Sequence, residues 1–104
     1  MDAFGYVLAS RRLVEERLPV LFMYRETPSG ADSGWRFFSG LEDQAYVDDP
    51  ANIAIYDVRT ILDVDRSVAP YLSAGPGSAL EREDEFQPFR FADDFGFAPE
   101  EGAP

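Results

Sequence analysis

The side chains of this 104-residue chain that could do chemistry are carboxylates, hydroxyls and arginines. The sequence contains no histidine, no cysteine and no lysine. It therefore lacks the usual general base, a thiolate nucleophile and the amine of Schiff-base chemistry. Two carboxylates alone can hydrolyse a glycoside, but a domain of this size leaves little space for a substrate cleft. We therefore expect no enzyme, no catalytic residue, no metal site and no cofactor.

Four carboxylates surround one tyrosine in the middle of the chain. They are Glu42, Asp43, Asp48 and Asp49, on either side of Tyr46. Their spacing does not match an EF-hand loop, which needs alternating ligands, a central glycine and a terminal glutamate. A stretch of this kind is by default a solvated acidic face, and the functional alternative is a surface that attracts a basic partner.

Trp35 and Arg36 stand at the start of an expected strand, directly after a loop with turn-forming residues. Tryptophan and arginine often anchor interfaces, so both are candidate contact residues. The structural alternative places Trp35 in the core and pairs Arg36 with a neighbouring acid. Asp32 and Gly34 fit an Asx turn in which Gly34 supplies a positive φ. Ser33 lies outside any G-x-S-x-G frame and has no base beside it, so it is not expected to act as a nucleophile.

The elements that must position these residues follow from hydrophobic spacing. Strands are expected at residues 6–9, 20–26, 35–39, 53–56 and 78–82, and helices at 11–18, 41–48, 58–62 and 65–72. Ser10 can cap the first helix and Pro19 stops it. The apolar run from Val20 to Tyr24 predicts an interior strand, because both of its faces must be covered. The fold class is α+β, a small, mainly antiparallel sheet with one N-terminal helix and short helices packed on it.

The length of the chain indicates a single domain, and its charge limits which classes of partner it can bind. Twenty acids against nine arginines give a formal net charge of -11, which argues against nucleic acid and against anionic membranes as partners. No signal peptide or membrane-spanning run is recognisable, so a soluble cytoplasmic protein is expected.

The charge and aromatic content change near residue 82. Residues 83–104 hold seven acids, one arginine and five of the nine phenylalanines. We expect residues 1–82 to form a single α+β domain and residues 83–104 to form an acidic, Phe-rich C-terminal tail. Exposed phenylalanines favour association, so this tail should dock on its own domain, on a second copy or on a partner.

Three segments resemble those of a known bacterial family. They are MYRETP at residues 23–28, DSGWRFFSG at 32–40 and DDPANI at 48–53. GSALER at residues 77–82 is similar to the closing segment of the same family. The family was first catalogued as a domain of unknown function and was later proposed to consist of immunity proteins of polymorphic toxin systems. The resemblance carries no catalytic residue with it.

The resemblance implies a protein that binds and neutralises a cognate bacterial toxin by occlusion, and a basic toxin would suit the acidic charge. The partner-binding surface is then expected to include the residues singled out above, namely Trp35, Arg36, Glu42, Asp43, Tyr46, Asp48 and Asp49. The alternative is a housekeeping module that binds a small ligand or self-associates, as in a homodimer, through its hairpin and aromatic tail.

Overall fold

Strands with alternating inward and outward side chains form one six-stranded sheet in the computed structural model, which describes residues 5–92. The strands are β1 (Tyr6–Ser10), β2 (Phe22–Arg25), β3 (Asp32–Phe38), β4 (Ile53–Asp57), β5 (Ala79–Glu81) and β6 (Arg90–Phe91). Their order is β4-β1-β3-β2-β5-β6. Only β1 and β3 pair in parallel, and the other neighbours are antiparallel. The expected α+β fold with a mainly antiparallel sheet is confirmed, and β2 is an interior strand.

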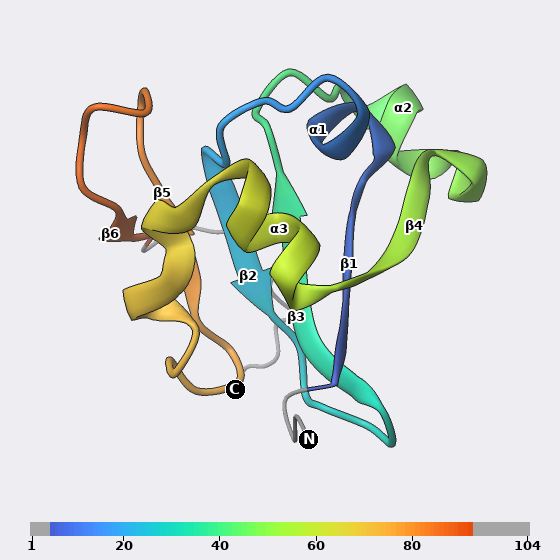
Figure 1. Ribbon diagram of the computed structural model, residues 1–104. Helices are drawn as coiled ribbons and strands as arrows, with labels where there is room; N and C mark the ends of the chain where they lie inside the picture. Colours follow the sequence, from blue (N-terminus) through green and yellow to red (C-terminus); the bar gives the residue numbers. More distant parts are fainter. Residues whose placement is uncertain (1–4, 93–104) are drawn as a thin grey trace.

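Residues 5–92 also form five short helices, which are α1 (Arg11–Glu15), α2 (Gln44–Asp48), α3 (Val58–Val64) and the 3₁₀ helices η1 (Pro50–Asn52) and η2 (Arg66–Tyr71). Of these five helices, α1, α3 and η2 supply core residues on one face of this sheet. Helices α3 and η2 cross the front of the sheet in Figure 1, whereas α2 lies at the upper right beside β4. The core between sheet and helices is built from fully buried side chains, among them Val7, Leu13, Met23, Trp35, Phe37, Ile61 and Leu80. None of the helices within residues 5–92 is long and apolar enough to cross a membrane.

The short helices begin at side chains that accept backbone N–H groups. Ser10, Asp43, Asp49, Asp57 and Asp65 serve as these caps. A cap satisfies one of the donors that a helix start leaves without a partner, and typically contributes about 1 kcal/mol. The predicted cap at Ser10 is confirmed. Helices of five to seven residues are too short to be stable alone, so caps and packing must hold them.

The first helix ends earlier than its hydrophobic pattern predicts. It stops at Glu15 because Arg17 adopts a left-handed conformation with φ 54°. The backbone N–H groups of Arg17 and Leu18 then donate to the carbonyls of Val14 and Leu13. This is a Schellman motif, which usually has glycine at the left-handed position. The expected end at residue 18 is therefore wrong by three residues, since a left-handed arginine could not be inferred from the sequence.

The third strand begins earlier than expected. Asp32, Ser33 and Gly34 belong to β3 and form an irregular segment, where the register shifts between Tyr6 and Leu8 of β1. The Asp32 carboxylate accepts the N–H of Gly34 at 2.9 Å, and Gly34 has φ 93°. A side chain on Gly34 would place its Cβ 2.1 Å from the carbonyl oxygen of Glu26. The predicted local geometry is confirmed, although it lies within the strand rather than before it.

A buried ion pair joins segments that are far apart in sequence. Arg82 Nη2 donates to Asp65 Oδ2 at 2.7 Å, and the two side chains are 3% and 11% exposed. The same carboxylate oxygen accepts the N–H of Val20, while Arg82 Nε donates to the Val20 carbonyl. The Arg82 guanidinium also lies 4.2 Å from the ring centre of Phe89. One pair thus connects β5, the start of η2, the segment before β2 and the segment before β6.

Of the three phenylalanines in the described part of the expected tail, only Phe89 packs on the domain, whereas Phe86 is 88% exposed and Phe91 63% exposed. Phe89 is buried and makes an edge-on contact with Tyr71, with 5.2 Å between ring centres. Arg90 and Phe91 form β6, which pairs with β5. Residues 93–104 of the expected tail, including Phe95 and Phe97, lie outside the described residues, and the boundary at residue 82 stays a prediction.

Asp65→Ala should lower the unfolding free energy by about 3–5 kcal/mol, because it leaves the Arg82 guanidinium buried without its charge partner. Urea unfolding monitored by circular dichroism measures this loss. Asp63→Ala is the matched control, since Asp63 pairs with Arg17 at the surface, where such pairs contribute at most about 1 kcal/mol. Equal losses in the two variants would show that the buried pair has no special role.

Candidate functional site

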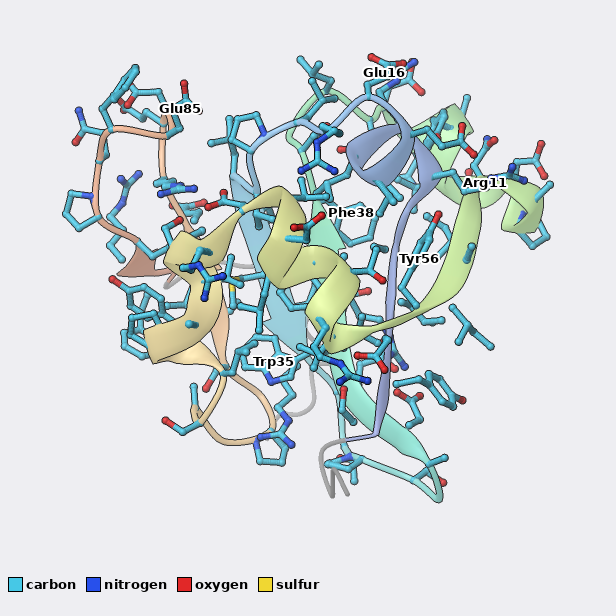
Figure 2. The ribbon with its side chains drawn as sticks, viewed as in Figure 1. Arg11, Glu16, Trp35, Phe38, Tyr56 and Glu85 are labelled. Carbon is cyan, nitrogen blue, oxygen red and sulfur yellow. The ribbon has the colours of Figure 1, made fainter. Side chains whose placement is uncertain are left out.

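Trp35 lies on the helix-covered side of the sheet and is 0% exposed. Its ring stacks on Phe37 at 5.9 Å, and its Nε1 donates to the Leu72 carbonyl at 3.1 Å. The Arg25 guanidinium lies 5.7 Å from the ring centre. A fully buried side chain offers no surface to a partner, so Trp35 can act on binding only by fixing the position of β3 (Figure 2).

Arg36 lies on the opposite face of the sheet, where its neighbours across the strands are Leu8 and Tyr24. Its guanidinium donates to both oxygens of Asp32, at 3.0 and 2.8 Å, and to Glu26 at 3.2 Å. These hydrogen bonds hold the pKa of Asp32 below its usual range, although burial acts in the opposite direction. The structural alternative, in which Arg36 pairs with a neighbouring acid, is confirmed, and these pairs fix the ends of the loop between β2 and β3.

The other five candidate residues lie together in the acidic segment, defined here as residues 41–52. This segment contains α2 and η1 and holds four carboxylates and no arginine. Asp43 caps α2, Asp49 caps η1, and Asp48 accepts the side-chain amide of Gln44 at 2.8 Å. Each of these aspartates is exposed. The segment is therefore an ordered acidic surface whose carboxylates point partly to the backbone and partly to solvent.

Glu42 fixes the beginning of the acidic segment. Its carboxylate accepts the N–H groups of Ser39 and Gly40 and the hydroxyl of Ser39, the last at 2.7 Å. Burial raises the pKa of Glu42, but hydrogen bonds from Ser10 and Ser39 outweigh it and hold the pKa below its usual range. The charged form of Glu42 thus stabilises the turn that leads from β3 into α2.

Tyr46 joins the acidic segment to the first helix through Arg12. The Arg12 backbone N–H donates to the Tyr46 hydroxyl at 3.0 Å, and its guanidinium lies 4.9 Å from the ring centre. The same guanidinium donates to the Leu41 carbonyl at 3.2 Å. The sequence pattern places Arg12 in solvent, and no local signal could reveal a contact between residues 34 positions apart. Arg12 is therefore a positioning residue that sequence reasoning missed.

The carboxylates of the acidic segment are in no ion pair with an arginine of residues 5–92, because the ion pairs there involve other acids. Within that range no three side chains of the metal-binding types come together. The described part of the chain brings no nucleophile, base and electrophile to one point. What the segment can do chemically is attract and hold cationic groups.

The fold and this segment define a small domain that presents a rigid, negatively charged surface. A family model described as the immunity protein Imm33 domain matches residues 7–92. The chain therefore belongs to the Imm33 family of immunity proteins, whose members neutralise toxins. The resemblance found in the sequence is confirmed at this level. Among curated proteins and among solved structures, none matches the chain.

Glu42→Gln should lower the unfolding free energy at neutral pH by about 1–2 kcal/mol, since an amide accepts fewer of these N–H bonds and carries no charge. The folded-state pKa of Glu42 lies below the unfolded value of about 4.3. Its stabilisation is therefore complete above the unfolded pKa and is lost as the pH falls through the folded pKa.

Denaturant unfolding from neutral to acidic pH measures this difference between the wild-type protein and the variant. The exposed Glu16→Gln serves as control and should match the wild type throughout. A Glu42→Gln difference that stays constant through the acidic range would contradict the assignment.

Proposed function

We propose that this immunity protein neutralises its toxin by binding it directly and covering the surface through which the toxin acts, with the acidic segment as part of the contact. Glu42, Asp43, Tyr46, Asp48 and Asp49 supply the charged face. The toxin surface that fits them is basic. Occlusion requires no bond to be broken, so the protein works without catalysis.

The observation that carries this proposal is the unpaired charge of the acidic segment. Four carboxylates lie within one short stretch, and no arginine of residues 5–92 forms an ion pair with them. Such charges repel one another and gain stability when a cationic surface approaches. Hydrogen bonds already hold Glu42, Asp43 and Asp49 in place, so little conformational entropy is lost on binding.

The two remaining candidates act from within the sheet in this proposal. Trp35 fixes β3 through the core, and Arg36 fixes the loop before β3 through Asp32 and Glu26. The turn held by Glu42 continues directly from β3, so the strand sets where the acidic segment begins. The cytoplasmic location expected from the sequence remains part of the proposal.

Co-expression with the toxin encoded by the neighbouring reading frame tests the proposal directly. Growth should be restored by the intact protein, and the two proteins should co-purify as a stable complex. The toxin's activity should also be inhibited in stoichiometric proportion when the purified proteins are mixed. Rescue of growth without any complex would contradict occlusion and favour a housekeeping role.

Asp48→Lys should slow association with the toxin several-fold at low salt, because charges at the rim of an interface act mainly on the on-rate. Glu85→Lys makes the same change in charge at the opposite end of the molecule in Figure 2 and should have a smaller effect. Stopped-flow or surface-based kinetics give both rates. The difference between the two on-rates should disappear as the salt concentration is raised from roughly 50 to 500 mM, because salt screens exposed charges. Identical on-rates for the two variants would remove the acidic segment from the interface.

A further inference from the structure

The two ends of the sheet differ in how they protect their backbone. At one end lies β6, which has only two residues and carries Arg90. At the other end lies β4, which has five residues and pairs with β1 in an uninterrupted register. In Figure 1 these strands form the left and right limits of the sheet. Within residues 5–92, β4 has a neighbouring strand on one side only.

The sequence of β4 carries only one of the usual devices that prevent an edge from pairing with another chain, the charged Asp57 at its end. IAIYD has no lysine, proline or glycine, and no bulge interrupts it. Proteins normally protect exposed edges with such residues or with very short strands, because free N–H and C=O groups otherwise recruit other strands. β-branched and aromatic residues also favour the extended conformation. The edge is therefore competent to accept one more strand.

Ile55 in the middle of β4 is a second unusual feature. Its side chain is 62% exposed on the face of the sheet away from the core, opposite Leu8. Beside it lies an open hollow of about 330 Å³ lined by Gly5, Tyr6, Ile55, Tyr56 and Asp57. The hollow is large enough for an apolar side chain and lies at the edge itself. Figure 2 shows Tyr56 at this side of the molecule.

We propose that β4 pairs with an extended segment of the toxin, which adds a strand to the sheet and places an apolar side chain against Ile55. This inference rests on the proposed function and names the part of the surface that gives it specificity. Main-chain hydrogen bonds supply affinity in this mode of recognition, and side-chain sites select the segment. The toxin segment should also carry basic side chains near the end that faces the acidic segment.

The charge of the protein favours a toxin segment over a second copy of the chain as the strand that pairs with β4. Asp48 and Asp49 come just before Ile53, and η1 connects them directly to β4. Two copies paired antiparallel about Ile55 would place Asp57 of each opposite Ile53 of the other, next to the end of β4 that follows Asp48 and Asp49. Each copy also has a formal net charge of -11. A basic strand meets the same carboxylates with favourable energy.

The area that a stable interface needs indicates that β4 and the acidic segment contact the toxin together. A stable complex buries about 800 Å² on each partner, which a five-residue strand alone does not provide. The acidic segment continues directly into β4, and Arg12 fixes it against α1. The edge strand and the acidic segment therefore form one continuous contact surface.

Amide hydrogen exchange of the ¹⁵N-labelled protein, free and bound to a catalytically inactive form of the neighbouring toxin, tests the inference. The β4 amides that point away from β1 should exchange rapidly in the free protein and slowly in the complex. β6 supplies the internal control, and its amides should not change. Protection of β4 in the complex requires no substitution, so the test does not depend on a variant that folds.

Ile55→Lys against Phe91→Lys is the matched pair of variants. Phe91 is 63% exposed on the other edge strand, so the two substitutions change charge and exposed apolar area alike. Ile55→Lys should weaken the Kd for the inactive toxin about ten-fold or more, and Phe91→Lys about two-fold or less. Titration calorimetry measures both values, and circular dichroism confirms that both variants fold.

The outcomes separate the two proposals. A complex that forms without protecting β4, and with equal Kd values for the two variants, overturns strand addition and leaves the proposed function intact. The absence of any complex overturns both. Protection of β4 in the protein alone, together with a doubled mass, would show that a second copy occupies the edge and would also overturn the inference.

Discussion

The buried pair of Arg82 and Asp65 is the interaction on which the rest of the architecture depends. It joins β5, η2 and the segment that leads into β2, and it places the Arg82 guanidinium over Phe89. Burial of two charges is costly unless every donor and acceptor finds a partner. Here the backbone of Val20 and the carbonyls of Glu85 and Gln87 complete the network. A small sheet with three-residue and two-residue strands at one side is thereby held in one arrangement.

Acidic side chains serve two purposes in this protein, which explains how a chain with a net charge of -11 folds compactly. Many carboxylates cap helices or accept backbone N–H groups, as Glu42, Asp43 and Asp49 do. The same side chains keep enough exposed surface to create a negative potential in water. An acidic surface that is also locally ordered suits a protein that must meet its partner quickly and fit it well. The chain belongs to the Imm33 family of immunity proteins.

Most of the fold could be predicted because its signals are local. Ser10 and Asp65 are residue types that typically cap helices, and the apolar run that ends at Tyr24 indicates an interior strand. The left-handed Arg17 could not be predicted, because arginine carries no preference for that conformation. The contact of Arg12 with Tyr46 was equally hidden, since tertiary packing alone brings these residues together.

The sequence by itself determined which functional groups the side chains carry and where most strands and helices lie. Without imidazole, thiol or amine side chains the chain offers carboxylates, hydroxyls and arginines for chemistry, and hydrophobic periodicity indicates which segments become strands and helices. Only the tertiary structure decided which candidates reach the surface. Trp35 went into the core while Asp43, Asp48 and Asp49 remained exposed, and β4 became an edge strand. The physical reason is that strand order and burial depend on contacts between distant segments, and no local pattern encodes which side of a strand stays unpaired.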